Sequence, residues 1–335
     1  MNRSGSFAIT DMRLGYFGSP PISARLLEAI LKSTDHTVAC VVSNPDRPRG
    51  RSGTFIPTEV AQLALERDIP LFRFEKLKAE NAAAQLAEFK VDLFVVFAYG
   101  RLLPEAVFQL PPLGSINLHA SLLPHLRGAA PIQMALYNGD PETGWSVQYV
   151  ATELDSGDVL ARAALKINPH ETAGELTERM LPGGIDLMLD TLDHFSERAA
   201  TATPQDPAQV TTCPKLTMEM SPIDWNNPAG IIHNRVRALN PWPVARTRFS
   251  GEKSIKVYRT APVLESDQDN ALPLAAPADA PGDFTVSRSG SQKRLFVRCG
   301  DARLLEILEL QPENRKKLTS GEFLNGYQKD SGRFE

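Results

Sequence analysis

The chain has 335 residues, 42% hydrophobic and 23% charged, which indicates a water-soluble protein of about two globular domains. No apolar run reaches the roughly 20 residues that a membrane helix needs, and a net charge of −4 does not favour a general nucleic-acid binder. The three cysteines are far apart and form no CxxC pair, which argues against a disulfide framework or zinc site and fits a reducing cytoplasm. Residues 1–11 are polar and predict a disordered lead-in, with no secretory signal.

The part of the chain from residue 12 to 197 alternates strand and helix signals, which is typical of a parallel sheet covered by helices. Buried strands are predicted at residues 12–17, 37–42, 92–98, 115–119 and 145–151. Helices are predicted at residues 22–31, 58–67, 82–89 and about 175–195. Ser19-Pro20 should cap the first helix, and Pro182-Gly-Gly should kink or split the last one. These signals predict an α/β domain.

Residues 198–213 are polar and contain prolines, which predicts a linker to a second domain over 214–335. That domain begins with a helix at about 228–239 and continues with short strand signals, which suggest a small barrel or sandwich. From Pro204 onward the chain has 18 Lys and Arg against 16 Asp and Glu, and the part before it has 18 against 24. This asymmetry permits an RNA partner for the second domain without requiring one. Trp242 is expected to pack between Pro241 and Pro243, and an exposed stacking role is the alternative.

Nucleotide-binding loops are the first possibility to test in an α/β chain. The first strand leads into Gly15-Tyr-Phe-Gly18, which is not the GxGxxG pattern of dinucleotide-binding folds, and a P-loop is also absent. The motifs therefore argue against a dinucleotide or ATP site.

Three polar residues stand out between residues 115 and 157. Asn117 and His119 are two residues apart on a predicted strand, so their side chains share one face and could stabilise negative charge on a carbonyl oxygen. Asp155 follows a later strand and could orient His119 or accept a proton from an amine. The alternative is that all three only cap loops and turns. His119 and His125 do not have the spacing of a standard metal-ligand set, so no metal is expected.

A loop of sequence PDRPRGR carries three arginines, Arg47, Arg49 and Arg51. Three guanidinium groups on one loop could bind phosphates, and the alternative is an ordinary solvated loop.

Together the motifs resemble the folate-dependent formyltransferase superfamily, and most closely its branch that acts on initiator methionyl-tRNA. The segments that carry the resemblance are GYFGSP, PDRPRGR, VVFAYGRLLP, NLHASLLP, RGAAP, ELDSGD, IDW, NPWP and LELQPENRK. They cover nearly the whole chain beyond Asp11. The resemblance implies a Rossmann-like N-terminal domain and a smaller OB-like C-terminal β-barrel domain. It also implies transfer of the formyl group of 10-formyltetrahydrofolate to the amino group of methionyl initiator tRNA, by a cytoplasmic monomer.

The resemblance further assigns residues by position. Asn117, His119 and Asp155 match the catalytic trio, and Ser121, Leu122, Leu123 and Pro124 match the folate-contacting segment. The loop of Arg47, Arg49 and Arg51 matches the segment that enters the acceptor end of the tRNA, but the lysines that usually follow it are missing after Arg51. The alternatives are the same transfer to a small amine such as an amino sugar or glycinamide ribotide, a hydrolase that releases formate, and a non-catalytic RNA-binding protein.

Overall fold

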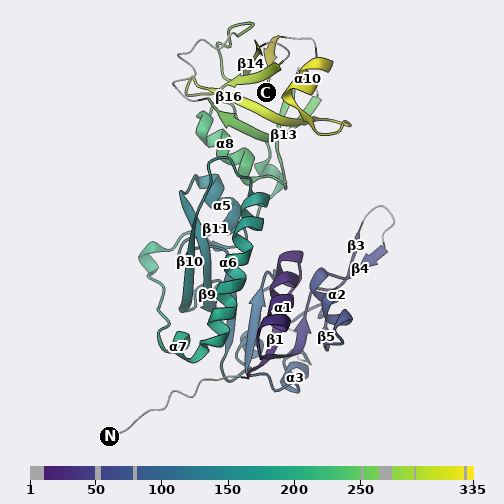
Figure 1. Ribbon diagram of the computed structural model, residues 1–335, viewed down its shortest axis with the longest axis vertical. Helices are drawn as coiled ribbons and strands as arrows, with labels where there is room; N and C mark the ends of the chain where they lie inside the picture. The colour runs from purple at the N-terminus through teal and green to yellow at the C-terminus, as the bar shows by residue number, and fades with distance from the viewer. Residues whose placement is uncertain are drawn as a thin grey trace. The chain divides into compact units, whose positions relative to one another are not determined.

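The computed structural model describes two compact units (Figure 1). The described residues are 11–49, 54–77, 81–249, 253–263, 274–289, 292–327 and 330–335. Unit 1 comprises residues 1–131, 143–165 and 179–213, and unit 2 comprises 132–142, 166–178 and 214–335. The predicted lead-in at 1–11 falls outside the described residues except for Asp11.

Unit 1 contains a seven-stranded sheet in the order β10-β9-β7-β6-β1-β2-β5. Its strands are β1 (Arg13–Gly18), β2 (Thr37–Val42), β5 (Leu71–Phe72), β6 (Leu93–Phe97), β7 (Ser115–His119), β9 (Glu142–Tyr149) and β10 (Val159–Lys166). Neighbouring strands from β5 to β7 are parallel, whereas β9 runs antiparallel to β7. The prediction of a Rossmann-like, mainly parallel sheet is confirmed.

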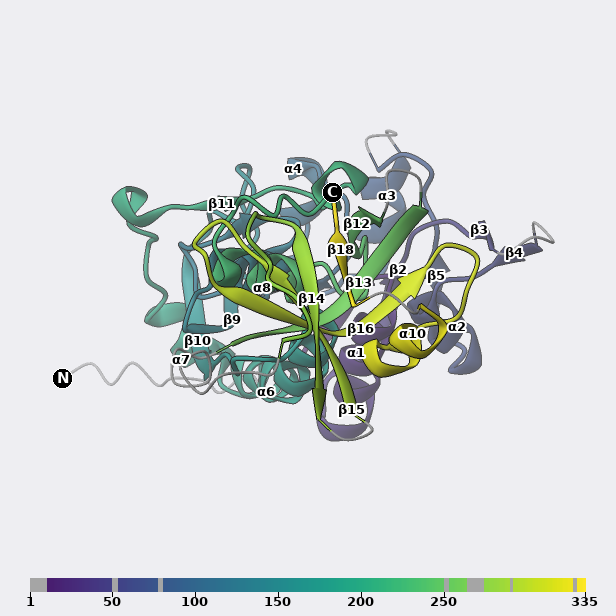
Figure 2. The ribbon, with the colours of Figure 1, turned by 90° about the horizontal axis from the view of Figure 1, so that it is seen from above.

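Helices cover both faces of this sheet. They are α1 (Pro21–Ser33), α2 (Glu59–Glu66), α3 (Asn81–Ala87), α4 (Glu105–Phe108), the larger part of α6 (Ala173–Asp193) and α7 (Phe195–Ala200). The helix α5 (Pro131–Asn138) belongs to unit 2 from its second residue on. Figure 2 shows α1 and α6 on one face and α3 and α4 on the other. The predicted cap of the first helix is wrong, because Pro20 occupies the N-cap position and makes no side-chain cap. The Ser19 hydroxyl instead accepts hydrogen bonds from the backbone and side chain of Asn44.

The helix that contains Pro182 is continuous from Ala173 to Asp193, so the proline does not split it. The glycine two residues later has a packing role. A β-carbon on Gly184 would lie 2.6 Å from Cε2 of Trp145, whose buried indole donates a 2.7 Å hydrogen bond to the carbonyl of Met180. The sequence Pro-Gly-Gly therefore allows the helix backbone to approach a large ring closely.

The segment 198–213, expected to be a linker, is hydrogen-bonded into unit 1. Within it lie the end of α7, the 3₁₀ turn η1 (Pro207–Gln209) and β11 (Thr212–Cys213), which pairs in parallel with β8 (Arg127–Gly128). Gln205 is buried at the centre of this segment. The segment thus lies against the loop that follows His119.

Unit 2 contains a curled antiparallel sheet in the order β12-β13-β16-β15-β14-β18, with β17 paired to β16 (Figure 2). Its strands are β12 (Ala245–Phe249), β13 (Lys253–Pro262), β14 (Asp283–Ser289), β15 (Gln292–Arg298), β16 (Leu304–Pro312), β17 (Leu318–Thr319) and β18 (Ser331–Arg333). An isolated bridge between Phe249 and Phe334 joins the two edges, which is the topology of a small barrel. The predicted OB-like second domain is confirmed.

Three helical segments accompany this sheet: η2 (Met218–Met220), α8 (Ala229–Ala238) and α10 (Ser320–Gly326). The predicted helix at 228–239 corresponds to α8. Trp242, which follows this helix, is 52% exposed, which favours the alternative of an exposed ring over a structural one. No helix in the described ranges is long and apolar enough to cross a membrane.

Candidate active site

Asn117 and His119 lie near the carboxyl end of β7, as the strand spacing predicted. Across the antiparallel pair, Asn117 faces Gln148 and His119 faces Ser146, so these four side chains share one face of the sheet. His119 is 6% exposed, while Asn117 is only partly buried. Among the described residues, none makes a hydrogen bond to the Asn117 side-chain amide. Its two N–H donors are therefore available to a bound molecule.

Both ring nitrogens of His119 face acceptors of the protein. Nε2 lies 2.9 Å from the carbonyl oxygen of Leu126, and Nδ1 lies 3.6 Å from Oδ2 of Asp155. The neutral ring has one N–H, so it can donate to both acceptors only as the imidazolium. Donation to a substrate oxygen would require His119 to share or give up one of these contacts.

Asp155 is held in a tight turn in the left-handed region, with φ of 52° and a side chain only 12% exposed. Its Oδ2 accepts a 2.9 Å hydrogen bond from the backbone N–H of Gly128, and its Oδ1 accepts a 3.1 Å bond from Nε2 of Gln148. Position 157 in the same turn requires glycine, because a β-carbon there would lie 1.9 Å from the carbonyl oxygen of Tyr149. The LDSGD turn therefore fixes a carboxylate beside His119, and the structure brings all three predicted residues to one place.

The segment Ser121–Pro124 follows β7 directly and is held by hydrogen bonds. The Ser146 hydroxyl donates to the carbonyl of Ser121 and accepts from the N–H of Leu123, at 2.7 and 3.0 Å. The Ser121 hydroxyl donates to the carbonyl of His125 at 2.5 Å. Leu123 and Pro124 are buried, and Leu122 is partly exposed. The segment is a fixed wall of the site, and its apolar surface toward solvent comes from Leu122.

The arginine loop is a hairpin of β3 (Arg47–Arg49) and β4 (Thr54–Ile56). Arg47 is exposed, and Phe55 on the paired strand is 67% exposed. The predicted Arg51 lies outside the described residues, and for Arg49 only the backbone is described. The loop is thus a projecting hairpin with at least one exposed guanidinium group (Figure 1).

Sequence reasoning missed Gln148, Gln205 and Thr211. The Thr211 hydroxyl accepts a 2.8 Å hydrogen bond from the N–H of Leu126, the residue whose carbonyl faces His119. Gln148 could have been noticed, because a polar side chain at alternate positions of a buried strand points into a site or a network. Gln205 and Thr211 lie in a polar, proline-bearing stretch that gave no such signal.

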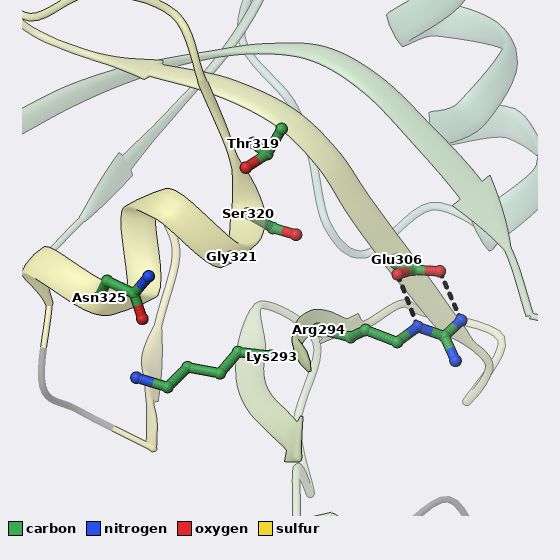
Figure 3. Close-up of a pocket in the computed structure, with 7 residues that line it drawn as sticks. All are labelled: Lys293, Arg294, Glu306, Thr319, Ser320, Gly321 and Asn325. Carbon is green, nitrogen blue, oxygen red and sulfur yellow. Dashed lines mark hydrogen bonds and ion pairs between the residues drawn. The ribbon is translucent and has the colours of Figure 1, made fainter. Parts of the chain in front are cut away.

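A hollow of about 450 Å³ lies elsewhere, in unit 2 (Figure 3). It is lined by Lys293, Arg294, Glu306, Thr319, Ser320, Gly321 and Asn325. Arg294 is already paired with Glu306 by two hydrogen bonds of 2.8 and 2.6 Å. The hollow contains none of the predicted site residues. In the part of the chain that the structure describes, no cluster of three or more His, Cys, Asp or Glu residues is arranged to hold a metal ion.

Two family models match the chain. Residues 12–192 match the formyl transferase family model, and residues 215–328 match its C-terminal domain model. A methionyl-tRNA formyltransferase of Leptospira interrogans is 41% identical over 323 residues, which is 96% of this chain and 99% of that protein. The chain belongs to the methionyl-tRNA formyltransferase family. A second member, from Staphylococcus aureus strain MW2, is 34% identical over 93% of this chain and 96% of its own length.

Solved structures of more distant proteins share the fold of this family member. HypX from Aquifex aeolicus in complex with tetrahydrofolic acid has a TM-score of 0.59 at 18% identity, over 95% of this chain and 48% of that chain. WlaRD, a sugar 3N-formyl transferase crystallised with dTDP and 5-N-formyl-THF, has a TM-score of 0.62 at 14% identity, over 91% of this chain and 99% of that chain. At these identities the likeness establishes the fold alone.

Proposed function

We propose that this chain transfers the formyl group of 10-formyltetrahydrofolate to the free amino group of methionyl initiator tRNA. The observation that carries the proposal is the 41% identity to a methionyl-tRNA formyltransferase over nearly the full length of both chains. The product would be N-formylmethionyl-tRNA, which serves translation initiation. The geometry around Asn117, His119 and Asp155 supplies groups suited to this chemistry.

The reaction begins when the amine nitrogen forms a bond to the formyl carbon, which turns the carbonyl oxygen into an oxyanion. Asn117 donates to that oxyanion, because its amide hydrogens have no acceptor among the described residues. Protonated His119, held between Leu126 and Asp155, stabilises the same charge electrostatically. Asp155 accepts the proton that the attacking amine loses. The intermediate then collapses: the oxyanion becomes a carbonyl again, the bond from carbon to the folate nitrogen breaks, and that nitrogen takes up the proton that Asp155 had accepted from the amine.

The 3.6 Å separation of Nδ1 of His119 from the Asp155 carboxylate is longer than a hydrogen bond. Catalytic contacts are often long without substrate and shorten when it binds. We infer that bound substrates bring these groups together. If Nε2 turns from Leu126 toward the oxyanion, His119 also becomes a second hydrogen-bond donor.

The folate is assigned to the wall formed by Ser121, Leu122, Leu123 and Pro124. The backbone and hydroxyl contacts of this wall with Ser146 and His125 leave it rigid, and Leu122 offers apolar surface to a flat ring. A rigid wall next to β7 would keep the formyl carbon within reach of Asn117. No metal takes part in the proposed reaction.

The acceptor end of the tRNA is assigned to the hairpin that carries Arg47, Arg49 and Arg51. If Arg47 contacts a phosphate, the logarithm of affinity falls with the logarithm of salt concentration, and Arg47→Ala reduces that slope by roughly 0.7 to 0.9. Arg67→Ala is a suitable control, because Arg67 directly follows α2, lies beside Glu28 and is outside the hairpin. If the salt dependence of affinity is the same in Arg47→Ala as in the parent protein, the hairpin is an ordinary solvated loop.

The proposed enzyme acts as a monomer in the cytoplasm. Transfer of labelled formyl from 10-formyltetrahydrofolate is the direct test, with methionyl-tRNA, an amino sugar nucleotide, glycinamide ribotide and water offered as separate acceptors. We expect transfer to methionyl-tRNA at a kcat/KM at least about 100-fold above the small amines, a gap that corresponds to about 2.7 kcal/mol. Preference for a small amine, or release of formate alone, would overturn the proposal.

A further inference from the structure

The polar segment after α7 contributes a side chain to the active site. Gln205 is only 8% exposed, although it lies in a stretch whose neighbours are mostly exposed. Its Nε2 lies 3.0 Å from Oε1 of Gln148 and 2.8 Å from each of the carbonyl oxygens of Asp155 and Gly157. Its Oε1 accepts a 2.9 Å hydrogen bond from Nε of Arg127. One buried amide thus contacts the strand, the turn and the loop that surround the site.

These hydrogen bonds have a fixed direction. An arginine side chain only donates, so the contact with Arg127 identifies the oxygen end of the Gln205 amide. The nitrogen end of Gln205 then shares its two hydrogens among Oε1 of Gln148 and the carbonyl oxygens of Asp155 and Gly157, so only the oxygen end of Gln148 can face it. Because that oxygen of Gln148 is engaged, its nitrogen end faces Asp155 and donates to Oδ1. The chain Arg127–Gln205–Gln148–Asp155 therefore always presents an N–H to the carboxylate.

A reversed Gln148 amide would place two oxygens about 3.1 Å apart. Their repulsion would move Asp155 away from its position beside His119, because the other contact, from the N–H of Gly128, reaches only Oδ2. The direction of the Gln148 amide thus determines where the carboxylate lies. Gln205 fixes that direction from outside the substrate-contacting surface.

We propose that Gln205 is a positioning residue that sets the carboxylate of Asp155 through Gln148. The inference rests on the proposed function for its kinetic test, and it deepens the account of the same site. It also changes the role of residues 203–213, which become part of the catalytic unit through Gln205, Thr211 and β11.

Gln205→Glu removes the donor role, because the glutamate keeps the shape and the acceptor for Arg127 but loses the N–H groups that face Gln148 and the carbonyl oxygens of Asp155 and Gly157. Gln209→Glu is the matched control: Gln209 lies on the same segment, is exposed, and contacts Asp206. We expect Gln205→Glu to lower kcat about 10- to 100-fold, the range of one hydrogen bond to a charged group. KM for both substrates should change less than about twofold, and Gln209→Glu should match the parent protein.

A double-mutant cycle separates positioning from a general effect on folding. In the Asp155→Asn background, Gln205→Glu should reduce single-turnover transfer by less than about twofold, because the group it positions is already disabled. Full loss of activity on top of Asp155→Asn would overturn the inference, and so would parent-like turnover in Gln205→Glu. If Gln205→Glu does not fold, Gln148→Leu removes the last donor of the chain directly and must show the same coupling to Asp155.

The NMR signals of the His119 ring give a readout that needs no acceptor. They should shift in Gln205→Glu, because the neighbouring carboxylate moves, and should stay unchanged in Gln209→Glu. Unchanged signals in both variants would overturn the positioning role even if the chain transfers formyl to methionyl-tRNA. Absence of transfer by the parent protein, with shifted signals in Gln205→Glu, would contradict the proposed function alone.

Discussion

Replacing Gly184 by alanine tests the close packing of α6 against the buried indole. The new methyl group would lie 2.6 to 2.8 Å from three atoms of Trp145, whereas carbon atoms pack at about 3.5 to 4.0 Å, so one side must move by roughly 1 Å. The ring is poorly placed to move. It is 2% exposed, its Nε1 donates a hydrogen bond to the carbonyl of Met180, and it forms a T-shaped pair with Phe97 at a centroid distance of 5.6 Å.

Overpacking of this kind lowers the free energy of unfolding by about 1–3 kcal/mol, whereas the higher helix propensity of alanine raises it by about 0.5–1 kcal/mol. Gly184→Ala should therefore lower the free energy of unfolding by about 1–2 kcal/mol, or the melting temperature by about 2–8 °C. Gly183→Ala is the control on the same helix, because a β-carbon there meets nothing within 4 Å. It should raise stability by about 0.5–1 kcal/mol.

Thermal and urea unfolding followed by circular dichroism measure both variants beside the parent protein. If Gly184→Ala is as stable as Gly183→Ala, the indole is not fixed against the helix and the packing argument fails.

Two further perturbations test the site and the second unit. Asn117→Ala should lower kcat by about 100- to 1,000-fold in steady-state kinetics, while the KM for folate changes little, as expected for loss of an oxyanion donor. If the substitution mainly raises KM instead, Asn117 only binds substrate. Burial lowers the pKa of His233 to about 4, below the value near 6.5 of an unfolded histidine, so the unfolded chain binds the proton more strongly between these values. His233 therefore contributes stability that is complete above about pH 6.5 and is lost as pH falls toward 4. In His233→Gln, the free energy of unfolding measured with urea should depend less on pH between about 4 and 6.5. If the pH dependence is the same as in the parent protein, other groups cause it.

Much of the fold could be predicted because its signals are local. The buried run at 92–98 became β6, and the periodic segments at 58–67 and 82–89 became α2 and α3. Asn117 and His119 could be paired because alternate residues of a strand share a face, whichever sheet the strand joins. The direction of β9 was not visible in the sequence, since an antiparallel partner and a parallel one give similar buried runs.

The rest of the site depends on contacts between residues distant in sequence. Gln205 reaches Gln148 across 57 positions, and Thr211 reaches Leu126 across 85. No local pattern marks such residues, and the prolines around them favoured a linker. The sequence left the exposure of Trp242 as the alternative for a related reason: flanking prolines restrict the backbone but do not determine what covers the ring.

Asp155, beside His119 and Asn117, is the proposed proton acceptor in formyl transfer to methionyl-tRNA. Single-turnover transfer of labelled formyl from 10-formyltetrahydrofolate to methionyl-tRNA by Asp155→Asn, with folate affinity measured in parallel, tests this role. We expect a loss of about 100- to 10,000-fold in transfer, as for removal of a general base, with folate affinity retained. Transfer by Asp155→Asn at a near-normal rate would show that Asp155 does not have this role.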